Sequence, residues 1–217
     1  MSETASPKSE SDYPEIDPVK RRASRIKLLT ILAVFAVPLI LATIYLQVVR
    51  LSGGQVGDTS RGQLIKPAVP LTEFSLQASD EVLELESLYG IWTMLYMPEG
   101  ECLDACRMSL YNMRQVRLAL NQRMDRVQRV VLAESAEQLD EALQAEHLGL
   151  IVATGSPAEQ AVLKDQVRAA ESAMESSTGA IYLLDPFGNV MLRFPADLPP
   201  ESMLKDIKHL LKVSRIG

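Results

Sequence analysis

Apolar residues fill the stretch from Leu28 to Val49 almost without interruption, whereas the residues before it are polar and show no hydrophobic period. As a helix with a rise of about 1.5 Å per residue, this stretch would extend for about 33 Å, which is enough to span the hydrocarbon core of a bilayer. We therefore predict a transmembrane helix over residues 28–49. The segment 1–27 cannot bury enough apolar area to order itself, so we expect a disordered tail there.

The charges that flank this apolar stretch predict its orientation. Five basic residues lie in the eight positions 20–27, whereas Arg50 is alone directly after the stretch. By the positive-inside rule, the tail is then cytoplasmic and the remainder of the chain lies across the membrane. In a bacterium this arrangement means a single pass through the inner membrane and a periplasmic domain. The periplasm is oxidising, so a disulfide would be stable there.

The remainder of the chain alternates between short apolar runs and stretches of helical period. Residues 50–70 are rich in glycine, proline and polar residues and are expected to form a linker before one domain over 71–217. The runs expected to be strands are 71–76, 91–96, 127–132, 148–153, 180–184 and 190–194. The helices are expected over 103–120, over 136–146, from 156 onward and over 200–213. Strand–helix alternation that ends in a hairpin and a helix predicts an α/β three-layer sandwich.

The charge of this domain limits its partners. Residues 51–217 contain 15 Lys+Arg and 23 Asp+Glu, which gives a net charge of 15 − 23 = −8. A nucleic-acid-binding domain normally carries a basic surface, so we expect no nucleic-acid partner. Six arginines are nevertheless clustered in the sequence, either as a solvated helix face with local ion pairs or as a docking site for an acidic partner. They are Arg107, Arg114, Arg117, Arg123, Arg126 and Arg129.

Cysteine occurs only at Cys102 and Cys106, at the turn between the predicted strand 91–96 and the following helix. If Cys102 begins that helix, the two Cα atoms lie about 6 Å apart, within the range of a disulfide. A helix N-terminus favours a thiolate, whereas the acidic neighbours Glu101 and Asp104 disfavour it. The same geometry offers two soft ligands to Cu(I). A purely structural disulfide is the alternative.

The domain resembles the Sco/SenC family, membrane-anchored thioredoxin-fold proteins that deliver copper to cytochrome c oxidase or reduce its thiols. The resemblance covers about residues 70–213 and is carried by the strand Trp92–Met97 leading into Cys102-x-x-x-Cys106, by 150–157 and by 182–188. The segments 62–67, 113–117 and 212–217 further resemble a group of Sco-like proteins of proteobacteria that is associated with oxidase assembly. The resemblance implies a thioredoxin-like sandwich, copper as a cofactor, and an oxidase subunit or another assembly factor as a partner.

The sequence departs from the Sco pattern at the third copper ligand. Sco proteins bind copper through two cysteines and a histidine, and the matching position here is Ser177. His147 is a poor substitute because it ends a helix at the opposite edge of the sheet, about 17 Å from the thiols. His209 lies in the closing helix, which favours a solvated or capping role. Met97, at the end of its strand, is the only methionine that we retain as a candidate third ligand.

Two further departures concern the loops around the cysteines. The acidic loop that follows the second strand in Sco proteins is replaced by Glu134-Ser-Ala-Glu137. No proline precedes Ala180, where thioredoxin-like oxidoreductases usually hold a cis-proline opposite their cysteines.

These observations favour a membrane-anchored protein that assists oxidase assembly through Cys102 and Cys106. The pair would bind Cu(I), as a metallochaperone-like site, or catalyse thiol–disulfide exchange, with Cys102 as the nucleophile. The alternative is a non-catalytic scaffold protein of the assembly machinery whose cysteines form a structural disulfide.

Overall fold

The computed structural model describes residues 18–51, 60–78, 81–171 and 179–216 of the 217-residue chain. The chain divides into two units, residues 1–58 and 59–217, and each is described by itself.

The first unit contains one long helix, α1 (Pro18–Leu51), with Pro38 inside it. Its segment Arg25–Tyr45 is long and apolar enough to cross a membrane. The prediction of a disordered tail is wrong for residues 18–27, which are helical. Lysine and arginine are good helix formers, and proline is favoured at the first helical position, so the helix extends beyond the apolar stretch at this end. The rest of the predicted tail lies outside the described residues.

The second unit is built on one mixed sheet, whose described strands have the order β1-β8-β7-β4-β5-β6-β2-β3. The strands are β1 (Gln63–Pro70), β2 (Ser75–Ala78), β3 (Glu81–Glu84), β4 (Trp92–Tyr96), β5 (Val127–Leu132), β6 (Leu150–Thr154), β7 (Ile181–Leu184) and β8 (Asn189–Phe194). The central strands β4, β5 and β6 are parallel, and β7 pairs antiparallel with β4. The predicted hairpin is confirmed, since β7 and β8 pair antiparallel.

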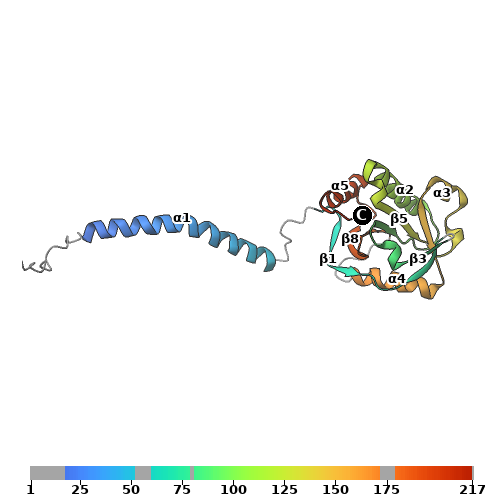
Figure 1. Ribbon diagram of the computed structural model, residues 1–217, viewed down its shortest axis with the longest axis horizontal. Coiled ribbons are helices and arrows are strands. Elements are labelled where there is room, and N and C mark those ends of the chain that lie inside the picture. The colour runs from blue at the N-terminus through green and yellow to red at the C-terminus, as the bar shows by residue number, and fades with distance from the viewer. Residues whose placement is uncertain (1–17, 52–59, 79–80, 172–178, 217) are drawn as a thin grey trace, which may run out of the picture. The chain divides into compact units, whose positions relative to one another are not determined.

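Helices cover both faces of the sheet, so the three-layer α/β sandwich is confirmed (Figure 1). On one face, α2 (Asp104–Ala119), α3 (Glu141–Glu146) and α5 (Pro200–Val213) bury their apolar sides, and on the other face α4 (Pro157–Ala170) does. Three short 3-10 helices, η1 (Leu85–Leu88), η2 (Asn121–Arg126) and η3 (Ala136–Gln138), complete the described elements. Alternate residues of β4 enter the two apolar clusters: Met94 and Tyr96 face α2, and Leu95 faces α4.

The domain begins earlier than we predicted, because β1 lies inside the segment expected to be a linker. Its pairing with β8 shifts in register between Leu64 and Val69, as fits an edge strand that contains two prolines. Asp206 of α5 holds the entry to this strand by accepting hydrogen bonds from the backbone N–H groups of Arg61 (2.7 Å) and Gly62 (2.8 Å). The linker prediction is therefore wrong for residues 63–70.

Other boundaries follow from local interactions. Ser156 is the N-cap of α4, the helix predicted from 156 onward: its hydroxyl accepts from the N–H of Glu159, and the Glu159 carboxylate accepts from the N–H of Ser156. The helix predicted over 136–146 is instead η3 followed by α3, because the Asp140 carboxylate caps α3 by accepting from the N–H of Leu143. The strand predicted over 71–76 begins only at Ser75, and β3 was missed.

Candidate functional site

Cys102 and Cys106 form a disulfide at the carboxyl end of β4. Their Cα atoms lie 5.0 Å apart, close to the spacing predicted from the sequence. The chain leaves β4 at Tyr96 and enters α2 at Asp104, so Cys102 precedes the helix and Cys106 lies in its first turn. The disulfide therefore joins the residues just before the helix to its first turn, whereas the predicted spacing has Cys102 as the first residue of the helix.

The disulfide is largely buried but reaches solvent on the side of Cys102. Cys102 is 8% exposed and Cys106 is 6% exposed, and both belong to the apolar cluster beneath α2. Cys102 also lines a pocket of about 510 Å³, which we call the thiol pocket, whereas Cys106 does not line it. A reagent in this pocket would therefore meet Cys102 first.

The opposite wall of the thiol pocket comes from the loop between β5 and α3, residues 133–140. The side chain of Gln138 joins this wall to the cysteine loop, since its amide donates to the carbonyl of Gly100 and its carbonyl accepts from the N–H of Glu134. The Glu134 carboxylate accepts a long hydrogen bond, 3.4 Å, from the N–H of Gly100. Parallel pairing of β4 with β5 places these two loops side by side.

The thiol pocket is acidic. Four carboxylate residues line it: Glu101, Glu134, Glu137 and Asp140. The backbone N–H of Leu143 and the Arg107 guanidinium, 2.8 Å away, lower the pKa of Asp140, and backbone and Ser135 hydrogen bonds lower the pKa of Glu137. Both groups are therefore ionised at neutral pH. Nearby negative charge disfavours a thiolate at Cys102 and attracts a cation.

The other residues considered as copper ligands do not meet at the disulfide. Met97 packs against the apolar cluster on the α4 face of the sheet, whereas both cysteines lie in the cluster on the α2 face. His147 is buried at the C-terminal end of α3, and His209 lies in α5. Ser177 lies outside the described residues. Among the residues that are described, no group of three or more His, Cys, Asp or Glu side chains could hold a metal ion.

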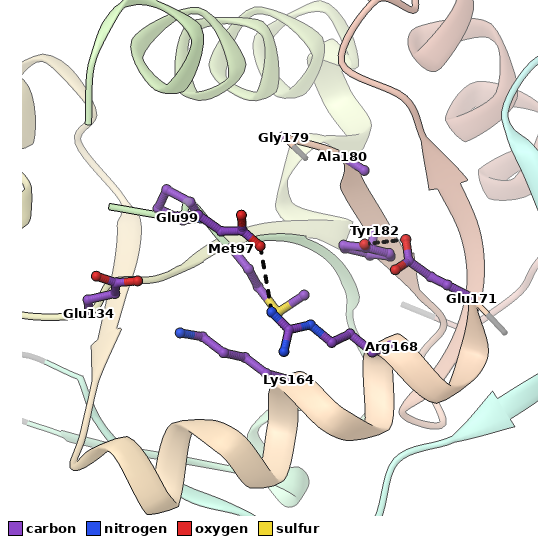
Figure 2. Close-up of a pocket in the computed structure, with 10 residues that line it drawn as sticks. Met97, Glu99, Glu134, Lys164, Arg168, Glu171, Gly179, Ala180 and Tyr182 are labelled. Carbon is purple, nitrogen blue, oxygen red and sulfur yellow. Dashed lines mark hydrogen bonds and ion pairs between the residues drawn. The ribbon is translucent and has the colours of Figure 1, made fainter. Parts of the chain in front are cut away.

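A second pocket, of about 270 Å³, lies at the same end of the sheet and contains Met97 (Figure 2). Lys164 and Arg168 reach into it from α4, and Arg168 lies 3.6 Å from the Glu99 carboxylate. Gly179 and Ala180 line its far wall. Glu134 lines both this pocket and the thiol pocket.

Sequence reasoning missed two members of the thiol pocket. Neither Gln138 nor Asp140 belongs to a recognisable sequence motif. The position of both residues just after a strand parallel to β4 was the available signal, because the carboxyl ends of parallel strands meet at one edge of a sheet.

The solved structures most similar to this one include several Sco proteins, as the resemblance predicted. Arabidopsis thaliana ScoI with copper bound has a TM-score of 0.54 and 22% identity, over 66% of this chain and 98% of that chain. Apo Sco1 from Thermus thermophilus has a TM-score of 0.57 and 16% identity, over 72% and 99%. BsSco, described as a Sco-family cytochrome c oxidase assembly protein with a disulfide switch, has a TM-score of 0.53 and 16% identity, over 73% and 100%. At these identities the likeness shows the thioredoxin-like fold.

No curated protein matches the chain. The family model of the transmembrane-like, thioredoxin-like C-terminal domain matches residues 92–214, which is more than half of the chain. This match includes the disulfide, the thiol pocket and the helices that cover them. The chain therefore belongs to the transmembrane-like, thioredoxin-like C-terminal domain family.

Proposed function

We propose that this protein is a membrane-anchored Sco-like factor that assists cytochrome c oxidase assembly through the redox pair Cys102–Cys106. The observation that carries the proposal is the disulfide between the end of β4 and the first turn of α2, with Cys102 open to the thiol pocket. Sco proteins of the same fold include copper-bound forms and a form with a disulfide switch.

Reduction of the pair converts it from a covalent link into a two-sulfur site. A dithiol reductant supplies two electrons and two protons, and its own sulfurs become the disulfide. Cys102 is the sulfur attacked first, because it lines the pocket and Cys106 does not. When the reduced pair instead attacks the disulfide of another protein, Cys102 is the nucleophile, because it is the cysteine that lines the pocket.

Copper fits this site as Cu(I) cargo. Two thiolates are soft ligands, and their spacing across the helix start suits coordination by both sulfurs. The acidic rim, with Glu134, Glu137 and Asp140, attracts a cation to the pocket. The described residues offer no third ligand of the usual Sco type, so we infer a site for Cu(I) rather than a tight Cu(II) site.

The location of the protein is part of the proposal. The apolar segment Arg25–Tyr45 is the anchor, with its basic flank in the cytoplasm and the thioredoxin-like domain in the periplasm. A C-terminal alkaline phosphatase fusion, which is active only outside the cytoplasm, tests this orientation. Replacing the five basic residues at positions 20–27 with glutamine should lower phosphatase activity. An active cytoplasmic reporter at the same position would contradict the proposal.

Competition with a chromophoric Cu(I) chelator tests the copper site. The full-length chain in a non-ionic detergent is reduced and titrated, and we expect one Cu(I) per chain with a sub-micromolar Kd. The double variant Cys102→Ser/Cys106→Ser should lose this binding, whereas Met97→Leu should retain it because Met97 lies on the other face of the sheet. Equal copper binding by the double variant would contradict the assignment.

The reduction potential of the Cys102–Cys106 pair distinguishes an exchangeable disulfide from a structural one. An exchangeable pair should equilibrate with a glutathione buffer, whereas a potential well below about −300 mV marks a structural disulfide. A pair that resists glutathione and also fails to bind Cu(I) would leave the alternative, a scaffold protein with a structural disulfide.

A further inference from the structure

Arg129 is a buried cation in the middle of the sheet. It is the third residue of β5 and is 2% exposed. Its neighbours two residues away on the strand, Val127 and Val131, belong to the apolar cluster on the α2 face, so Arg129 points to that face as well. One guanidinium nitrogen, Nη2, donates to the carbonyl of Leu148 at 2.6 Å.

The remaining guanidinium nitrogens of Arg129 have no partner in the described part of the chain. Both Nε and Nη1 are buried without a hydrogen bond. Burial and the neighbouring charges of Arg117 and Arg114 lower the pKa of Arg129 to about 10, so the side chain is still protonated at neutral pH. A buried charge with unused donors is costly unless an anion or another acceptor pairs with it.

A pocket of about 340 Å³ opens beside this guanidinium, and we call it the arginine pocket. Three arginines line it, Arg114, Arg117 and Arg129, against the single carboxylate of Glu146. The Nε atom of Arg117 already donates a hydrogen bond of 2.7 Å to the carbonyl of Val127. Arg114, in contrast, has no hydrogen bond or ion pair with any described side chain. The pocket thus combines positive charge with donors that no described residue of the domain uses.

The wall of the arginine pocket is also apolar at two places. Leu118 of α2 is 47% exposed, and Leu148, in the turn before β6, is 82% exposed. Arginine is enriched at protein–protein interfaces, and exposed apolar side chains rimmed by polar residues mark interaction sites.

We propose that the arginine pocket binds a carboxylate on an acidic segment of a partner protein, with Leu118 and Leu148 contacting apolar residues beside that carboxylate. A carboxylate accepts two parallel hydrogen bonds from a guanidinium, and it would pair with the unused donors of Arg129 and Arg114. The pocket lies at the C-terminal half of α2, about 15 Å along the helix from the cysteines, so this inference does not depend on the copper or thiol chemistry.

A lipid headgroup is the less suitable occupant. The domain has a net charge of −8, which an anionic bilayer surface repels. Three arginines line this pocket, whereas membrane-binding surfaces usually carry several basic residues over a broad area. An acidic protein segment, in contrast, can bind through the positive charge of the pocket arginines alone.

The two histidines of the chain provide a site-specific readout. His147 is 3% exposed and next to the arginine pocket, and Arg129 and Arg114 act on it electrostatically. His209 belongs to α5 and is the internal control. The imidazole signals of histidine-labelled full-length protein are followed by NMR in a non-ionic detergent. The probes are the peptide acetyl-leucyl-glutamyl-leucinamide and its glutaminyl counterpart, which carries no charge.

We expect the glutamyl peptide to shift the His147 signals to saturation and to leave those of His209 in place. The variant Arg114→Gln should weaken the binding about tenfold, as expected for the loss of one charge-assisted hydrogen bond. The matched control Arg123→Gln should leave binding unchanged, because Arg123 is exposed on η2 and does not line the pocket.

Four outcomes would overturn the proposal. The first is no shift of the His147 signals up to about 10 mM peptide, a concentration at which even weak contacts are populated. The second is an equal shift with the uncharged peptide. The third is an equal response to inorganic phosphate, and the fourth is binding to anionic vesicles that Arg114→Gln abolishes. The third outcome would indicate a site for small anions, and the fourth a lipid surface. A shift that needs both the carboxylate and Arg114 supports the proposal.

Discussion

The Nε atom of Arg193 on β8 lies 2.6 Å from the Oε1 atom of Glu171 at the end of α4, and both side chains are nearly withdrawn from solvent. The hydroxyl of Tyr182 donates to the same carboxylate oxygen. Glu171 thus joins the helix layer to two neighbouring strands of the sheet.

Replacing this carboxylate should be costly. We expect Glu171→Gln to lower the free energy of unfolding by about 3 kcal/mol, because breaking a buried ion pair leaves a desolvated charge with weaker compensation. Urea denaturation of the full chain in detergent measures the effect. The control is Arg168→Gln, whose ion pair with Glu99 is more than half exposed and should be worth less than about 1 kcal/mol. Similar losses in the two variants would contradict the prediction.

Reduction of the disulfide should leave the domain folded. The bond closes a loop of only five residues, 102–106, and the chain-entropy relation gives a stabilisation of about 2 kcal/mol for such a loop. The apolar side of α2, including Leu110 and Met113, remains buried without it. Urea denaturation with and without a phosphine reductant tests this expectation. Loss of the native far-UV circular dichroism on reduction alone would favour a structural disulfide.

The contact between α5 and the entry to β1 should depend on the charge of Asp206. The side chain is buried and accepts two backbone hydrogen bonds, from Arg61 and Gly62. Asp206→Asn should lower the free energy of unfolding by about 2 kcal/mol, since hydrogen bonds to a charged group are stronger than those to an amide. Amide hydrogen exchange at Gly62 should accelerate. Asp197→Asn, at an exposed position, is the matched control, and an equal effect there would refute the explanation.

Stability should fall on mild acidification because of His147. Burial first, and then the charges of Arg129 and Arg114, lower the pKa of His147 below its ordinary value of 6.5. The folded state therefore favours the neutral imidazole, so this contribution to stability is present above pH 6.5 and is lost as the pH falls below it. His147→Gln should flatten the dependence of the unfolding free energy on pH in that range. NMR titration checks the pKa directly: Arg114→Gln should raise it, and a wild-type pKa above 6.5 would contradict the argument.

Elements with a clear period and a local stop signal could be predicted from the sequence. The buried run of β4 and the capping box of Ser156 and Glu159 are of this kind, because each depends on neighbouring residues only. The position of Cys102 and Cys106 at the end of β4 followed from the same run. These features required no knowledge of the tertiary structure.

The rest depends on contacts between distant residues. The segment of β1 has two prolines and follows a stretch rich in glycine and polar residues, so it resembles a linker until β8 and Asp206 are placed beside it. Gly62 shows the same dependence, since a Cβ atom there would lie 2.6 Å from the Phe194 ring. The acidic side of the thiol pocket depends on a distant contact as well, because its residues meet the cysteine loop only through parallel pairing of β4 and β5.

Glu134 lines both pockets, so its one negative charge is shared between them. A cation beside Cys102 would draw this carboxylate toward the α2 face of the sheet. The ammonium of Lys164 and the guanidinium of Arg168 would then have less negative charge opposite them. A cation bound beside the disulfide would then change the charge balance of the second pocket through a single side chain, Glu134.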